Sequence, residues 1–318
     1  MATTDHADRL PPANPQTIES LSIGQVSYRQ PDGLILSTGN LYFTSHDANY
    51  GTVWRTAQDA VAGQEILLYA EPGARFGDIV FAQVDGTFYG YFFARQTDER
   101  LAQIKRIPLT GGGATTLATL PGDVDIEYSH HNLVTDGSYL YWQDEIAVRQ
   151  MPIGGGTITE LAAITTQAPT AGVYLLEDRL IYASGNEIRW VSTDGPTEGP
   201  PPIIVTGPDR VTAIFPRVDG VYWGDQSGVL RLRVQQGGLV SIINAPAAVT
   251  GAVTSIGLAP GALVWSRAGG SAAFIVFNVS VNHWFQPAGS DPLGIAVTTQ
   301  GAEHVFWGDS QGVHRWPA

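Results

Sequence analysis

A short aromatic phrase recurs along this chain and constrains its fold more than any other feature of the sequence. In TDGSYLYWQDE, residues 135–145, a turn precedes a run of three apolar residues, and acidic residues close the phrase. Related phrases are TGNLYFTSHD at 38–47, VDGVYWGDQ at 218–226, APGALVWSRA at 259–268 and QGAEHVFWGDS at 300–310. The chain is therefore expected to consist of structural repeats.

The spacing of the phrases indicates the kind of repeat. Aligned by the middle residue of each apolar triplet, seven units are centred on Tyr42, Tyr89, Tyr141, Ile181, Tyr222, Val264 and Phe306. Successive centres lie 40 to 52 residues apart. A period of this length, built from short strands, is typical of β-propeller blades. The sequence therefore predicts an all-β chain that forms a seven-bladed β-propeller.

A pattern of four strands also recurs within the units. In the third unit the segments are HHNLVTDG, YLYWQD, AVRQMPI and TITELAAI, and a GGG turn separates the last two. They are rich in β-branched and aromatic residues and are bounded by Gly, Asp, Asn or Pro, as strands and their turns usually are. We therefore expect blades of four antiparallel strands.

The two ends of the chain suggest how the ring closes. The last unit ends at GVHRWPA, which supplies a third strand but leaves no residues for a fourth. Near the N-terminus, TIESLSI at 17–23 has the composition of a strand. We expect this segment to complete the last blade, because pairing would cover two open sheet edges. Residues 17–318 would then form a single domain, preceded by a flexible segment at 1–16.

Two of the repeated motifs resemble known propeller families. YWGD at 222–225 is close to the YWTD signature of lipoprotein-receptor propellers. LYW followed by VRQMPIGGG resembles bacterial propellers of the TolB-like and virginiamycin-B-lyase-like kinds. The resemblance covers residues 17–318 and implies a seven-bladed propeller. It implies no single function, because such propellers include receptors, lectins, lyases, hydrolases and scaffolds.

Composition excludes several classes of partner and site. The formal charge is −13, so the protein repels nucleic acids and anionic lipid surfaces. The absence of cysteine excludes disulfides and thiolate metal sites. No apolar run is long enough to span a membrane, and the N-terminus lacks the features of a secretory signal. We expect a soluble protein, either cytoplasmic or a mature exported form.

The loop PGDVDIEYSHHNLV, at 121–134, is the richest in reactive groups. Asp125, Glu127, His130 and His131 could act as acid/base groups or hold a divalent metal ion in the channel. The alternative is a solvated acidic loop that leads into an ordinary strand. No cofactor is predicted, because the spacing matches no recognised metal-binding motif.

Three further loops are expected at the same channel mouth. They carry guanidinium, carboxylate, imidazole and aromatic groups, which suit an anionic or hydroxyl-rich small molecule. The candidate ligand-binding residues are Arg75, Phe76, Asp78, His46, Arg210, Phe215 and Arg217. The alternative is that the arginines pair with carboxylates to tie blades together, and that the loop after His46 is an ordinary hairpin.

These observations leave three classes of function. A multivalent lectin would repeat one loop in every blade, whereas these loops differ in length and charge. One site at the mouth of the axial channel fits better, and the leading hypothesis is a recognition propeller that binds a carbohydrate or another small polar molecule. The alternatives are a lyase or hydrolase that uses the histidine and carboxylate groups, and a protein-interaction scaffold.

Overall fold

The computed structural model describes residues 31–37, 39–46, 49–57, 65–96, 102–120, 133–164, 171–196, 199–217, 220–228, 230–234, 240–243, 251–259, 262–267, 271–276, 282–285, 294–297, 304–309 and 312–317. Among these residues there are strands and turns but no helix, and no segment is a helix long and apolar enough to cross a membrane. The strands form seven antiparallel sheets, six of four strands and one of three.

The sheets follow one another along the chain. The first contains β1 (Pro31–Ser37), β2 (Asn40–His46), β3 (Tyr50–Ala57) and β4 (Ile66–Pro72); the second contains β5 (Ala74–Val84), β6 (Thr87–Gln96), β7 (Ala102–Pro108) and β8 (Thr115–Thr119). The third contains β9 (Leu133–Thr135), β10 (Tyr139–Gln143), β11 (Ala147–Pro152) and β12 (Thr159–Ala163); the fourth contains β13 (Val173–Leu176), β14 (Arg179–Ser184), β15 (Glu187–Ser192) and β16 (Ile203–Thr206).

The remaining strands repeat this order. The fifth sheet contains β17 (Val211–Arg217), β18 (Gly220–Asp225), β19 (Leu230–Val234) and β20 (Val240–Ile243). The sixth contains β21 (Val253–Ala259), β22 (Ala262–Arg267), β23 (Ser271–Val276) and β24 (Asn282–Phe285), and the seventh contains β25 (Gly294–Val297), β26 (His304–Asp309) and β27 (Gly312–Pro317).

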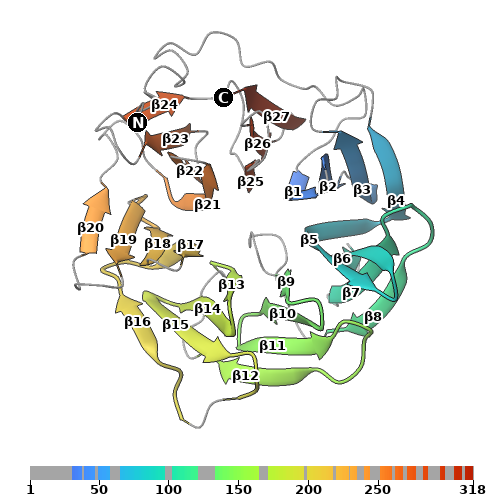
Figure 1. Cartoon of the computed structure of the whole chain (residues 1–318), viewed down its shortest axis with the longest axis horizontal. Helices are drawn as coiled ribbons and strands as arrows, with labels where there is room; N and C mark the ends of the chain where they lie inside the picture. Colours follow the sequence, from blue (N-terminus) through green and yellow to red (C-terminus); the bar gives the residue numbers. More distant parts are fainter. Residues whose placement is uncertain are drawn as a thin grey trace, which may run out of the picture.

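The first strands of the sheets form a closed ring. Strands β1, β5, β9, β13, β17, β21 and β25 each contact the next, and β25 contacts β1. Figure 1 shows these strands nearest the centre and the fourth strands at the outer rim. The prediction of an all-β propeller is thereby confirmed. The segment expected to complete the last blade, residues 17–23, and the expected flexible segment 1–16 lie outside the described residues, so the closure stays a prediction.

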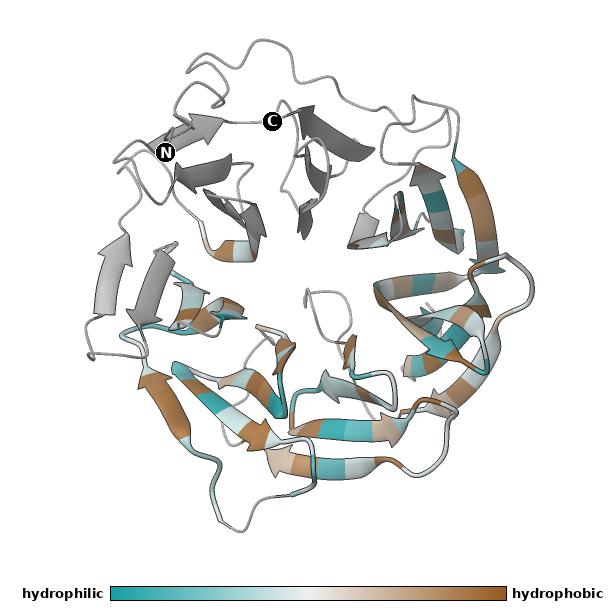
Figure 2. Cartoon of the chain, in the orientation of Figure 1, coloured by the Kyte–Doolittle hydropathy of each residue, from teal (hydrophilic) through white to brown (hydrophobic). Residues whose placement is uncertain are grey.

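The aromatic phrases lie on the second strand of each sheet, where they fill the space between neighbouring blades. Side chains alternate across a strand, so Tyr141 packs with Tyr182 of the fourth blade, while Trp142 packs with Tyr91 of the second blade. Figure 2 shows that β11 and β15 both carry hydrophobic residues, in brown, and hydrophilic residues, in teal. Trp142 and Trp223 are both buried in hydrophobic clusters between blades, so their role is structural.

The register corrects one alignment made from the sequence. Val80 pairs with Tyr91, just as Val134 pairs with Tyr141. Tyr91 is therefore the middle residue of the second blade, and Tyr89 lies two residues before it. The sequence suggested Tyr89 because the apolar run in TFYGYFFA is longer than in the other phrases.

The glycine of YWGD also has a packing reason. A Cβ atom added to Gly224 would lie 2.2 Å from the Cβ of Val253, on the innermost strand of the sixth blade. Because no side chain fits in that space, Gly224 allows the fifth and sixth blades to pack closely.

Candidate functional site

The antiparallel order divides the loops between two faces of the ring. The mouth face carries the connections between blades, such as Gly73, and the loops from each second strand to the third. The reverse face carries the turns from first to second strands, such as Asp85–Gly86, and from third to fourth strands, such as Gly111–Gly113. Arg75, Phe76, Asp78, His46 and Arg210 come from loops of the mouth face or from the parts of the strands next to them. Arg217 is instead the last residue of β17, beside the turn to β18 on the reverse face, and Phe215 lies two residues before it.

Three side chains from three different blades approach one another near the axis. Tyr174 lies on β13 and Phe215 on β17, and their rings meet edge to face with centroids 6.4 Å apart. Burial raises the pKa of the Tyr174 hydroxyl above its ordinary value, and the negative charge of Asp78 on β5 raises it further. The second, fourth and fifth blades thus contribute to one cluster, which we call the axial cluster: Asp78, Tyr174 and Phe215.

Arg217 extends this cluster along β17. It lies two residues after Phe215, so both side chains are on the same face of the strand. Both are half-buried, whereas Asp78 is only 8% exposed. The axial region therefore combines aromatic rings, a carboxylate and a guanidinium group.

Tyr174 is the member of the cluster that the sequence analysis missed. It pairs with Ile181, the middle residue of the fourth blade, just as Phe215 pairs with Tyr222 in the fifth. Both residues therefore hold the same register position on an innermost strand. An aromatic residue facing the middle of a phrase is the signal that could have identified it.

The other candidates of the mouth face have different surroundings. Phe76 is 1% exposed and packs against Tyr69 and Phe92 in the core between the first two blades. Arg75 is half-buried on β5, opposite Arg95. His46 is the half-buried last residue of β2. Phe76 is thus part of the packing, while Arg75 and His46 lie nearer the surface.

Arg210 precedes β17 and is also half-buried. Its backbone N–H donates to the Asp209 carboxylate at 2.7 Å, and its carbonyl oxygen accepts from the N–H of Gln226 at 2.9 Å. Its Nε atom is buried and has no hydrogen-bond partner within the described part of the chain. The backbone of Arg210 therefore links the segment before β17 to the turn after β18, and these bonds do not use its Nε–H group.

The candidate acid/base residues cannot be placed in the same way. Asp125, Glu127, His130 and His131 lie in 121–132, outside the described residues. Within the described ranges, no group of three or more histidine and acidic side chains could hold a metal ion.

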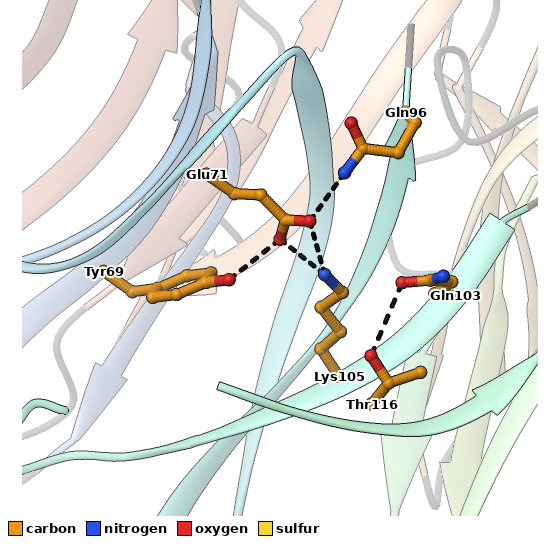
Figure 3. A network of polar contacts seen from close by, with 6 residues as sticks. All are labelled: Tyr69, Glu71, Gln96, Gln103, Lys105 and Thr116. Carbon is orange, nitrogen blue, oxygen red and sulfur yellow. Dashed lines mark hydrogen bonds and ion pairs between the residues drawn. The ribbon is translucent and has the colours of Figure 1, made fainter. Parts of the chain in front are cut away.

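The most enclosed ion pair joins the first two blades (Figure 3). The Glu71 carboxylate on β4 accepts two bonds from Lys105 Nζ on β7, at 2.6 and 2.5 Å, and one each from Gln96 and Tyr69, at 2.6 and 2.9 Å. The side chains of Lys105 and Glu71 are 8% and 15% exposed. All these groups have partners, so the network ties the blades together and offers little to a ligand.

A second buried carboxylate explains the acidic end of the phrase. Asp144 Oδ1 accepts from the N–H groups of Ile146 and Ala147, at 3.0 and 2.8 Å, and Oδ2 accepts from Arg149 Nε at 2.6 Å. The carboxylate thus closes the turn between β10 and β11. Its role is structural.

A shallow groove opens on the outer side between the third and fourth blades. It has a volume of about 330 Å³ and lies between β12 and the proline-rich segment before β16. Arg189 lines it, but its guanidinium donates to the Glu187 carboxylate at 2.6 Å and to the Pro201 carbonyl oxygen at 2.7 Å. Most of the other lining residues are alanine, leucine, glycine and proline, so the groove offers few polar groups to a ligand.

Comparisons with known proteins bear on the fold. No protein-family model and no curated protein matches the chain. The WD40 β-propeller domain of Doa1 is similar over 95% of this chain and 94% of that one, with a TM-score of 0.67 and 13% identity. The computationally designed Ika8 protein is similar over 93% of this chain and 99% of its own, with a TM-score of 0.55 and 14% identity.

Raptor from Chaetomium thermophilum is similar over 94% of this chain but only 28% of its own, with a TM-score of 0.65 and 10% identity. At such identities the likeness shows the β-propeller fold alone. The finer resemblance to YWTD-like, TolB-like and virginiamycin-B-lyase-like propellers is not confirmed by these comparisons and stays a hypothesis.

Proposed function

We propose that this chain is a recognition propeller that binds a carbohydrate or another small polar ligand on its axis, at the mouth face. The observation that carries the proposal is the axial cluster, in which Asp78, Tyr174 and Phe215 come from three blades. The innermost strands of a propeller bring such residues together although they are far apart in the sequence. A single site of this kind also agrees with loops that differ from blade to blade.

The groups of the axial cluster suit a hydroxyl-rich molecule. Aromatic rings cover the apolar C–H faces of a sugar, while a carboxylate accepts hydrogen bonds from its hydroxyl groups. The Tyr174 phenol, like an ordinary tyrosine, is protonated at neutral pH, so its hydroxyl can both donate and accept. Arg217 adds a donor for an anionic substituent such as a carboxylate.

A thermal-shift screen with neutral and acidic sugars tests this proposal. A ligand that binds only the folded protein raises its melting temperature; a concentration of 100 times Kd adds about 2.7 kcal/mol of stability. We expect at least one sugar to stabilise the protein. Phe215→Ala should weaken that binding at least tenfold in calorimetry, because it removes one wall of the site.

Phe88→Ala provides the matched control. Phe88 is 50% exposed at the start of β6, on the reverse face, so its loss should leave sugar binding unchanged. The proposal is wrong if no sugar in the panel stabilises the protein at millimolar concentration, or if Phe215→Ala and Phe88→Ala bind the sugar equally well.

A further inference from the structure

On the reverse face, the second and fourth blades each place an arginine over an aromatic ring. In the second blade the Arg106 guanidinium lies 4.8 Å from the centroid of the Tyr89 ring. In the fourth blade Arg179 lies 4.6 Å from the Trp190 ring. In the second blade the ring is on the second strand and the arginine on the third, whereas in the fourth blade the arginine is on the second strand and the ring on the third. In both blades a guanidinium of the same blade covers the ring.

The third blade has the ring but a different neighbour. Tyr139 pairs with Pro152 as Tyr89 pairs with Pro108, so the two tyrosines hold equivalent positions. In the second blade Arg106 pairs with the middle residue, Tyr91. At the equivalent position of the third blade, Gln150 pairs with the middle residue, Tyr141. Tyr139 is 37% exposed. Among the described residues, an arginine lies over the rings of Tyr89 and Trp190 but none over that of Tyr139.

One carboxylate lies beside this tyrosine. The Asp136 carboxylate accepts from the N–H groups of Ser138 and Tyr139, at 2.7 and 2.8 Å, and from the Tyr141 hydroxyl at 2.7 Å. Although burial opposes ionisation, these hydrogen bonds hold the pKa of Asp136 below its ordinary value. The Asp136 carboxylate is ionised at neutral pH, as an ordinary aspartate is, and the ring of its partner Tyr141 lies 6.1 Å from the Tyr139 ring, centroid to centroid.

The fourth blade contacts the same Tyr141 hydroxyl. Thr193 interacts with the Tyr141 hydroxyl, and its own N–H and hydroxyl donate to the carbonyl oxygen of Asp178, at 2.9 and 3.2 Å. The Asp178 side chain is 67% exposed, and its distance to the Arg179 guanidinium is 3.8 Å. Asp178 is therefore already paired with Arg179 of its own blade, and the carboxylate bonded beside Tyr139 is that of Asp136.

We propose that Tyr139 is a docking position for an arginine side chain of a protein partner. The guanidinium stacks on the exposed ring, as Arg106 stacks on Tyr89 in the neighbouring blade, and Asp136 provides the opposite charge. Arginine fits better than lysine because its planar group stacks on an aromatic face. The net charge of −13 also draws a basic partner toward the protein.

Two short peptides test the site. One is acetyl-Gly-Arg-Gly-amide, and the other has citrulline, a neutral analogue of arginine, in place of the arginine. NMR titrations at low ionic strength follow the tyrosine ring signals of the protein. We expect the arginine peptide to shift the signals of Tyr139 and to bind at least fivefold more tightly than the citrulline peptide.

The variant Gln150→Arg gives the sharpest test, because it restores the arrangement of the second blade. Its own guanidinium should cover Tyr139 and weaken binding of the arginine peptide at least fivefold, while the protein stays folded. Tyr139→Leu should have the same effect, whereas Phe88→Leu should have none.

The proposal is overturned if the citrulline peptide binds as tightly as the arginine peptide, if the Tyr139 signals do not move, or if Gln150→Arg binds the arginine peptide like the unaltered protein. Phe215→Ala, on the axis, should leave this titration unchanged, so failure here and failure of the axial site are distinguishable.

Discussion

The surroundings of a buried side chain in this protein depend on which of the two neighbouring blades it faces. Tyr182, on β14, faces the third blade and is 0% exposed. Within the described part of the chain its hydroxyl has no hydrogen-bond partner. Burial raises the pKa of this hydroxyl to about 12. The positive charge of Arg189 lowers the pKa, and the negative charge of Glu187 raises it. The aromatic phrase predicts that a ring is buried here, but not that its hydroxyl is left without a partner.

Tyr182 therefore makes stability depend on pH in the alkaline range. Its folded pKa lies above the ordinary value near 10, so the folded state holds its proton more tightly than the unfolded state. The resulting stability is complete below about pH 10 and is lost as pH rises toward 12. We expect the free energy of unfolding to fall over this interval, and Tyr182→Phe to reduce the fall by on the order of 1–2 kcal/mol.

Urea unfolding at pH 8, 10 and 11.5 measures this effect. Tyr139→Phe is the control, since Tyr139 is partly exposed on the reverse face. This variant should lose stability at alkaline pH as steeply as the unaltered protein. An equally steep alkaline fall in Tyr182→Phe would show that the buried hydroxyl is not responsible.

The strands show a second regularity that the sequence only partly reveals. A basic residue on the third strand faces the large aromatic residue of the phrase in three successive blades: Lys105 opposite Phe92, Arg149 opposite Trp142 and Arg189 opposite Tyr182. Each is paired with a carboxylate from a different place: Glu71 of the preceding blade, Asp144 of the adjoining turn and Glu187 on the same strand. The strand pattern was predictable, but these partners depend on how side chains reach across the finished sheets.

The Glu71–Lys105 pair is expected to hold the first two blades together. Lys105→Met should lower the free energy of unfolding by about 3 kcal/mol, because it leaves the enclosed Glu71 carboxylate without its cation. The double variant Lys105→Met with Glu71→Leu should recover much of this loss, since two apolar side chains replace the pair. Urea unfolding of the two variants measures the difference.

Glu160→Gln is the matched control for that pair. Glu160 is 50% exposed and lies 3.6 Å from Arg149, and such surface pairs contribute about 0–1 kcal/mol. If Lys105→Met costs no more than Glu160→Gln, the first two blades are held by their apolar core and not by this pair.

At the scale of the whole molecule, the period of the phrases was enough to predict the propeller, because each blade repeats one local pattern. The axial cluster was not predictable in the same way. Asp78 and Phe215 were singled out in separate loops, and Tyr174 was missed, because their meeting requires the innermost strands to close into a ring. The placement of Asp125, Glu127, His130 and His131 stays a prediction, as these residues lie outside the described part of the chain.

The account as a whole depends on that closed ring, in which we expect residues 17–23 to complete the last blade beside β27. Two truncations test this directly by differential scanning calorimetry. Removal of residues 1–16 should leave the melting temperature unchanged. Removal of residues 1–23 should lower it by roughly 10 °C, since it uncovers the edge of the last blade and opens the ring. Equal melting temperatures for the two truncated proteins and the full chain would contradict the account.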